Sequence, residues 1–272
     1  MQVIPVTDVS RGFGSTSRRD AWWVAPLAVF LGLGTFVIYS TWAAFQNAHY
    51  TFGPYLSPFY APVLWASPDN AAGLEHAWFG AKPDWFPALL PFSPALLILP
   101  FPGLFRFTCY YYRGAYYKAF WADPPSCAVG EPRNSYWGEQ TFPLILQNVH
   151  RYFLYIACIF LFLLAYDVWL ATRWPDGAGG TTFGIGVGTL VLAVNVVMLS
   201  SYTLGCHAMR HIVGGFHDEV SKHSLCDGAY ACSSALNYKH QLFAWISLFT
   251  VGFADLYVRL CSMGILTDYR IL

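Results

Sequence analysis

The chain has 272 residues, of which 56% are hydrophobic and only 11% are charged. About a quarter of the residues in a typical soluble domain are charged, so this composition excludes an ordinary soluble protein and indicates one that lies within a membrane. The formal net charge is zero and the Lys and Arg residues are scattered, which excludes a nucleic-acid-binding protein with a continuous basic surface.

The long apolar segments predict an all-α membrane protein, with about five transmembrane helices bundled in a single domain. A helix rises about 1.5 Å per residue and needs roughly 20 apolar residues to cross the hydrocarbon core. The first segment is longer than the core of a signal peptide and has no clear small-residue cleavage site, so we expect it to be retained. In chain order, the expected spans are residues 21–45, 85–112, 150–172, 181–212 and 240–264.

Proline and aromatic residues mark the region between the first and third of these spans. The segment 85–112 contains five prolines, which remove backbone donors and clash with preceding carbonyls, so we expect a kinked or irregular helix. The loop before it, residues 46–84, is rich in Pro, Tyr and Trp, a composition typical of an ordered cap at the membrane surface. Farther along, the glycines of residues 184–188 indicate close helix packing.

The distribution of positive charge predicts a multi-pass protein of the cell membrane with its amino terminus in the cytoplasm. In that orientation, residues 1–20, 106–151 and 210–240 face the cytoplasm and carry 11 of the 15 Lys and Arg residues. Cytoplasmic loops of membrane proteins are enriched in these two residue types. The bias therefore favours this orientation over its reverse.

Seven Cys and His side chains lie at or just inside the predicted cytoplasmic face. Neutral imidazole is a good iron ligand and thiolate favours iron–sulfur chemistry, so the set permits either a haem held by two histidines or a mixed Cys and His cluster. Each residue alone is explained equally well as a helix-capping group or a small buried hydrophobe, but their convergence on one face favours a metal centre. The seven residues are Cys109, Cys127, His150, Cys206, His207, His211 and His240.

Two other groups of side chains bear on function. His207 and His211 are four residues apart, so on a helix both rings lie on one face and can chelate one metal ion. Toward the opposite face, the spans contain the ionisable residues Asp167, Asp255 and Arg259. A membrane acid could pass protons to a quinone, but snorkelling of these side chains to the interface explains them as simply.

Five separated segments carry a more specific signal than the apolar helices alone. They are Thr108-Cys-Tyr-Tyr-Tyr-Arg113, Pro124-Pro-Ser-Cys-Ala-Val129, Gln147-Asn-Val-His-Arg-Tyr152, Gly205-Cys-His-Ala-Met-Arg-His211 and Thr267-Asp-Tyr-Arg-Ile-Leu272. Together they resemble the single-chain membrane anchor of an actinobacterial succinate dehydrogenase, respiratory complex II. The resemblance extends over most of residues 50–272.

This resemblance implies a complex that links the tricarboxylic acid cycle to electron transport. A flavoprotein partner would oxidise succinate, an iron–sulfur partner would deliver electrons to the anchor, and the anchor would reduce a quinone in the surrounding lipid. The resemblance also implies that a Rieske-type [2Fe–2S] cluster replaces haem in the membrane subunit, with two Cys on one iron and two His on the other.

The resemblance supplies more candidate ligands than such a cluster needs. We expect Cys109, Cys127, His207 and His211 to hold it, with His150, His240 and Cys206 in reserve. The side chains of adjacent residues on a helix point about 100° apart, so Cys206 and His207 do not easily serve one compact cluster, whereas His207 and His211 share a face. A pairing of His150 with His240, across two helix starts, is the competing choice.

The resemblance also gives the predicted inner loop, residues 110–139, a role in docking the iron–sulfur partner. Its positive side chains Arg113, Lys118 and Arg133 offer charge complementarity, although ordinary positive-inside anchoring explains them equally.

Two functions outside this assignment compete with it. A related anchor that binds haem b is the nearest rival. A membrane transporter is a more distant one, since transporter folds have pseudo-symmetric halves and no internal repeat is evident here.

Overall fold

The computed structural model describes residues 12–68, 70–87, 91–133, 142, 144–177, 179–215 and 217–272. Its contacts divide the chain into two units. The first contains Met1–Val37 and Arg106–Val149, and the second contains Ile38–Phe105 and His150–Leu272. Helices dominate, which confirms the predicted all-α class, and the strands form two small antiparallel pairs.

Four helices in the described residues are long and apolar enough to cross a membrane. They are α1 (Val24–Gln46), α6 (His150–Leu170), α7 (Val187–Leu204) and α10 (His240–Ser262). Their 18 to 23 residues correspond to about 27–35 Å at the usual rise of an α-helix. These helices match the first, third, fourth and fifth predicted spans.

The second predicted span, residues 85–112, is broken as its prolines predict. Residues 88–90 lie outside the described part of the chain. The rest forms three short helices, α3 (Pro94–Ile98), α4 (Pro100–Phe107) and α5 (Tyr110–Tyr116), and a π-helical turn follows. Pro94 and Pro100 each occupy a first helical position, where the missing N–H costs no hydrogen bond. A fifth membrane crossing remains a prediction.

The predicted span 181–212 is shorter than expected, because α7 ends at Leu204 and α8 (His207–Gly214) is a separate helix. The chain turns at Gly205, where an added Cβ would lie 2.8 Å from the carbonyl oxygen of Ser201 and 2.9 Å from Cβ of Leu236. Only glycine fits so close to its neighbours. The turn therefore ends the span.

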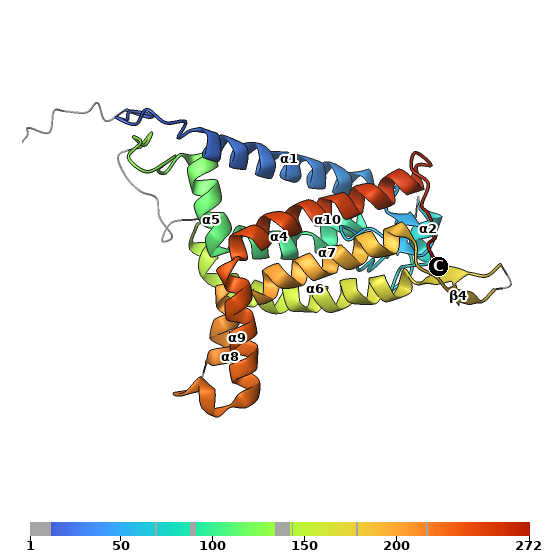
Figure 1. Cartoon of the computed structure of the whole chain (residues 1–272). Helices are drawn as coiled ribbons and strands as arrows, with labels where there is room; N and C mark the ends of the chain where they lie inside the picture. Colours follow the sequence, from blue (N-terminus) through green and yellow to red (C-terminus); the bar gives the residue numbers. More distant parts are fainter. Residues whose placement is uncertain are drawn as a thin grey trace, which may run out of the picture. The chain divides into compact units, whose positions relative to one another are not determined.

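The segment 210–240, which the charge distribution predicts to face the cytoplasm, is largely helical. After a short 3₁₀ turn, α9 (Ser224–Tyr238) returns alongside α8, and the pair runs across the direction of α6, α7 and α10 at their end (Figure 1). Ser233 and Asn237 donate hydrogen bonds to the carbonyls of Leu204 and Gly205, at 2.7 and 2.8 Å. These side chains satisfy orphan carbonyls at the end of α7, a tertiary effect that polar composition does not reveal.

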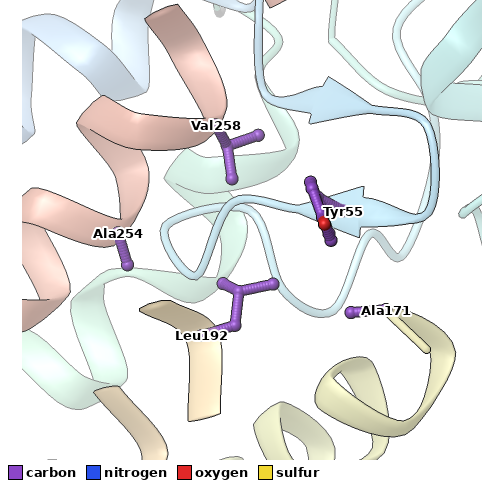
Figure 2. Packing of buried hydrophobic residues seen from close by; sticks show 5 residues of the cluster. All are labelled: Tyr55, Ala171, Leu192, Ala254 and Val258. Atoms are coloured by element: carbon purple, nitrogen blue, oxygen red, sulfur yellow. The ribbon is translucent and has the colours of Figure 1, made fainter. Parts of the chain in front are cut away.

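The three spans of the second unit pack around a tyrosine from the cap. α7 lies between α6 and α10 and contacts both. The strands β1 (Thr51–Phe52) and β2 (Tyr55–Leu56) form a tight hairpin that carries the Tyr55 ring, fully buried, into the core. Figure 2 shows this ring beside Ala171, Leu192, Ala254 and Val258.

The glycines of residues 184–188 make room for that tyrosine. A Cβ on Gly188 would lie 2.4 Å from the Tyr55 ring, and one on Gly186 would lie 2.2 Å from its hydroxyl oxygen. The predicted close packing is present, but its partner is an aromatic ring rather than a second helix. Asp268, in the carboxyl-terminal segment, accepts hydrogen bonds from the hydroxyls of Tyr55 and Tyr257, at 2.8 and 2.6 Å.

The remainder of the loop 46–84 forms the expected ordered cap. The rings of Tyr50 and Tyr60 stack with centroids 4.1 Å apart, and both residues are fully buried. The Tyr60 hydroxyl donates to the carbonyl of Ala43, near the end of α1, at 2.7 Å. The aromatic residues thus fasten the cap to a membrane helix.

The first unit is held by contacts between residues 12–20 and the loop after α5. The backbone amides of Gly14 and Gly130 donate to carbonyls across the two segments. Arg18 donates to the Ser126 hydroxyl and to the carbonyl of Cys127, at 3.0 and 2.9 Å. These bonds order the loop that contains Cys127.

Candidate metal centre

One end of the second unit contains five of the seven candidate ligands, and three of these lie where a helix begins. α6 begins at His150, α10 begins at His240, and Cys206 caps the start of α8 just after α7 ends. Because α7 runs antiparallel to the other two helices, these points lie at the same end of the spans. The predicted convergence is present for His150, His240 and Cys206.

The closest of these contacts joins a cysteine to a histidine. Sγ of Cys206 lies 3.0 Å from Nε2 of His150, and Cys206 is only 3% exposed. A thiol and an imidazole in contact share a proton readily, and both become metal ligands when deprotonated. This pair places one thiolate and one imidazole donor together.

Aromatic rings fix both helix-initiating histidines. Phe105 stacks on His150, with centroids 4.7 Å apart and planes 7° apart. Tyr202 stacks on His240, with centroids 5.0 Å apart and planes 16° apart, and the rings of Phe105 and Tyr202 meet edge to face with centroids 5.6 Å apart. The rings hold the imidazoles in defined planes and cover part of their surface, so both histidines are half-buried.

His207 and His211 share one face of α8, as their spacing predicts. Their Nε2 atoms are 3.0 Å apart and their rings are nearly perpendicular. Both side chains are exposed and line a cavity of about 320 Å³ between α8 and α9. The pKa of His207 lies below that of free histidine, mainly because the ring is partly desolvated and also because the neighbouring charges of His211 and Arg210 disfavour its protonated form. His207 and His211 are thus more exposed than the pair formed by Cys206 and His150.

The two cysteines assigned from the sequence belong to the first unit. Cys109 caps the start of α5 and is buried, whereas Cys127 is exposed in the loop that Arg18 holds. Their role as ligands remains a prediction.

The donor set fits an iron centre in its chemistry. Imidazole and thiol groups at the membrane end of a helical bundle are the ligand types that haem and Rieske-type clusters use. Among the described residues, no group of three or more His, Cys, Asp or Glu side chains is already arranged around a metal position. Within the described residues, candidate ligands therefore lie in pairs, Cys206 with His150 and His207 with His211.

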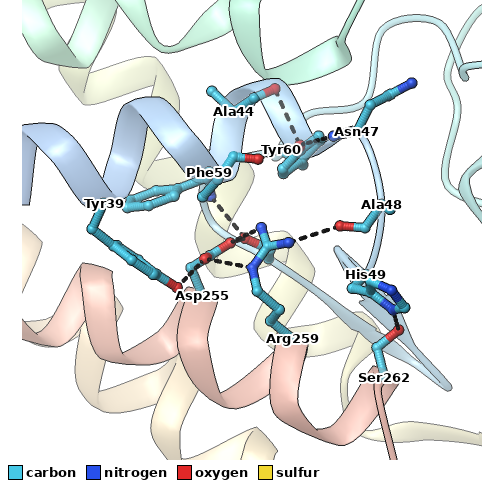
Figure 3. Close-up of polar contacts among 12 residues, drawn as sticks. Tyr39, Ala44, Asn47, Ala48, His49, Phe59, Tyr60, Asp255, Arg259 and Ser262 are labelled. Atoms are coloured by element: carbon cyan, nitrogen blue, oxygen red, sulfur yellow. Dashed lines mark hydrogen bonds and ion pairs between the residues drawn. The ribbon is translucent and has the colours of Figure 1, made fainter.

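The opposite end of the spans contains a buried ion pair. Asp255 and Arg259, one turn apart on α10, are 0% and 1% exposed and approach to 3.3 Å. Asp255 also accepts hydrogen bonds from Tyr39 of α1, at 2.5 Å, and from Ser57 of the cap. Arg259 donates to the carbonyl of Ala48 at 2.9 Å (Figure 3).

This ion pair corrects one reading of the sequence. Arg259 does not extend to the protein surface, so snorkelling does not explain it. Asp167 differs, since one of its carboxylate oxygens is buried and has no hydrogen-bond partner within the described residues. Nothing in the sequence around Asp255 pointed to Tyr39 or Ser57, because these partners are about 200 residues away.

Comparison with known proteins identifies the family. Residues 24–264 match the family described as actinobacterial succinate dehydrogenase subunit SdhC. The chain belongs to this family. It is therefore a multi-pass membrane subunit of succinate dehydrogenase, as the resemblance of its motifs implied.

A solved structure supports the same assignment. The chain is similar to a chain in the structure titled "Mycobacterium smegmatis Sdh1 complex in the apo form", with 42% sequence identity and a TM-score of 0.84. The match covers 100% of this chain and 96% of the other. A search of curated proteins gave no match.

The loop predicted to dock a partner of this SdhC-family subunit is only partly described, since residues 134–139 lie outside the described part. Within it, Arg133 forms an ion pair with Asp123 at 3.2 Å and donates to the carbonyl of Trp121. The Arg113 guanidinium lies over the Tyr110 ring, 4.7 Å from its centroid. Arg133 is therefore engaged within the chain, and docking by this loop stays a prediction.

Proposed function

We propose that this membrane subunit passes electrons from an iron–sulfur partner to a membrane quinone, by way of a metal centre at the end of the spans where α6 and α10 begin. A flavoprotein partner would oxidise succinate, and this chain would not contact succinate. The family supports the place of the chain in succinate dehydrogenase. The observation that carries the proposal is the contact between Cys206 and His150.

We assign His150 and Cys206 to this centre, with His240 as a further imidazole ligand, rather than His207 and His211. The first three are held at helix starts, and stacked rings orient the two imidazoles. Cys206 is buried and the two imidazoles are half-buried against aromatic rings, a position that suits a redox centre because surroundings of low polarity limit reorganisation and solvent access. His207 and His211 are exposed, and their cavity also contains the positive charge of Arg210.

A Rieske-type [2Fe–2S] cluster would supply one-electron chemistry there, at a potential raised by two neutral imidazoles in place of thiolates. Phe105 and Tyr202 would exclude water. Their stacked rings would also prevent His150 and His240 from rotating away. Cys206 would hold the metal as a thiolate, and His150, 3.0 Å away, would supply an imidazole nitrogen beside it.

The test is low-temperature EPR and a reduced-minus-oxidised optical spectrum of the purified complex. We expect a Rieske-type signal that is lost in His150→Ala and in Cys206→Ala but survives in the double variant His207→Ala plus His211→Ala. A signal that survives in His150→Ala and Cys206→Ala but is lost in the double variant would show that His207 and His211 of α8 are the ligands. A signal that survives in all these variants would contradict both assignments.

A haem b centre is the second candidate, because His150 and His240 are both imidazoles oriented by stacking. The same optical spectrum distinguishes the two. A haem α-band that is lost in His150→Ala and in His240→Ala would show that the redox centre is haem rather than a cluster. Electron transfer to quinone would remain the proposed function.

A further inference from the structure

The cavity between α8 and α9 contains a positive charge that no carboxylate of the described residues neutralises. It is lined by Arg210 together with His207, His211 and Tyr230, and by the backbone of Gly214 and Gly215 near the end of α8. Within the described part of the chain, no carboxylate lies within ion-pair distance of Arg210. Glu219, one of the acids on the helical hairpin formed by α8 and α9, pairs with Lys222 at 3.0 Å.

The hydrogen bonds of Arg210 are also incomplete. Its guanidinium donates to the Tyr230 hydroxyl at 2.9 Å and, weakly, to Asn237 at 3.4 Å. Its Nε is buried and has no hydrogen-bond partner among the described residues. A buried, unsatisfied donor on a charged group is costly, and a bound anion would remove that cost.

The other lining groups favour an anion over a metal cation. His207 and His211 alone provide two nitrogen ligands, no third ligand is assembled with them in the described residues, and the Arg210 charge repels a cation. An anion instead accepts hydrogen bonds from imidazole N–H groups and from the rigid guanidinium fork, a geometry that matches phosphate. The cavity has a volume of about 320 Å³, near the lower limit of the range of about 300–1,000 Å³ for ligand sites, so it can hold a lipid headgroup.

The position of the helical hairpin formed by α8 and α9 indicates where a phosphate ligand would come from. α8 begins three residues after α7 ends, and α8 and α9 run across the direction of the spans (Figure 1). Because α6, α7 and α10 are long and apolar enough to cross the bilayer, a hairpin that runs across them at their end would lie along the membrane surface, at the level of the lipid headgroups. Exposed apolar side chains at both ends of α9, Leu225 and Tyr238, suit such an interface.

We propose that the cavity binds the phosphate of an anionic phospholipid, with Arg210 as the principal charge and His207 and His211 as additional donors. Basic pockets beside membrane helices bind anionic headgroups in this way. This inference is independent of the metal centre, since it uses neither His150 nor Cys206.

The experiment is calorimetric titration of the detergent-purified complex with dioctanoyl phosphatidylglycerol, dioctanoyl phosphatidylcholine or inorganic phosphate. We expect the anionic lipid to bind about tenfold or more tightly than the zwitterionic one, and Arg210→Gln to weaken it by about tenfold to a hundredfold, the usual value of a charged hydrogen bond. Lys222→Gln is the matched control, because it removes one positive charge from the same hairpin outside the cavity, and we expect no change.

Two further variants guard against a failure of folding. Arg210→Lys keeps the charge but loses the planar fork, so it should retain part of the affinity, and the His207→Ala plus His211→Ala variant should weaken binding less than Arg210→Gln does. Equal binding by wild type and Arg210→Gln, or equal losses in Arg210→Gln and Lys222→Gln, would overturn the proposal.

Three other results would also overturn it in favour of a different ligand. Inorganic phosphate that binds as tightly as the lipid and competes with it would make free phosphate the ligand. Zn²⁺ binding that depends on His207 and His211, with lipid binding indifferent to Arg210, would make the cavity a metal site. Loss of a partner subunit in Arg210→Gln, with lipid binding unchanged, would make it a protein contact.

Discussion

Sγ of Cys206 lies 3.0 Å from Nε2 of His150, although 56 positions separate the two residues. Cys206, which follows the turn at the end of α7, thus contacts His150, the first residue of α6, whose ring stacks on Phe105. It is the relationship on which the proposed electron path depends.

The first prediction concerns activity. Cys206→Ala should greatly reduce succinate-dependent quinone reduction by the complex, because electrons would reach the partner but not pass beyond it. Succinate oxidation with a soluble artificial acceptor, which does not require the membrane subunit, should remain. The two rates are measured on the same preparation, with Cys232→Ala as control, since Cys232 is exposed on α9. Equal loss of both rates would indicate a folding defect instead.

The second prediction concerns the buried ion pair. Asp255→Asn removes the charge that balances Arg259, and breaking a buried pair by removing one partner typically costs about 3–5 kcal/mol. We therefore expect a clear fall in the denaturation midpoint of the purified complex. The double variant Asp255→Leu plus Arg259→Met should be less destabilised than the single one, because no buried charge is left alone.

The exposed ion pair in the segment between α8 and α9 provides a control for this prediction. Glu219→Gln disrupts the exposed pair with Lys222, and exposed pairs are worth about 0–1 kcal/mol, so the midpoint should scarcely move. A midpoint for Asp255→Asn as high as that of Glu219→Gln would show that the α10 pair does not stabilise the fold.

The third prediction concerns the contact between Gly188 and Tyr55. In Gly188→Ala the new Cβ would meet the Tyr55 ring at 2.4 Å, and overpacking of this kind costs about 1–3 kcal/mol. We expect a lower midpoint of thermal unfolding. Gly34→Ala is the matched control, since nothing lies within 4 Å of that position, and alanine is favoured over glycine within a helix by about 1 kcal/mol. Similar midpoints for both variants would contradict the packing argument.

The fourth prediction concerns orientation in the membrane. If the amino terminus is cytoplasmic, the exposed Cys127 should react with a membrane-impermeant maleimide from the cytoplasmic side. We expect labelling in inside-out vesicles and little in right-side-out vesicles, each compared with Cys127→Ser. Labelling confined to right-side-out vesicles would reverse the predicted topology.

The sequence alone determines the membrane class, four of the spans and the breaking of the segment 85–112. These features are local, because about 20 successive apolar residues or a cluster of prolines act on the stretch of chain that contains them. The spacing of His207 and His211 is likewise a local property, since any α-helix places residues four apart on one face. The family also follows from motifs that the chain carries in sequence.

Tertiary structure alone decides which candidate groups meet. Leu236 of α9 packs against the turn at Gly205 where α7 ends, and Ser233 and Asn237 of α9 donate hydrogen bonds to the free carbonyls there. That turn separates the buried Cys206 from the exposed His207, which are neighbours in the chain. Composition and spacing contain no information about contacts across 56 or about 200 residues, because such contacts depend on how whole helices pack. The sequence therefore indicates seven candidate ligands, and only the fold shows which of them lie in contact.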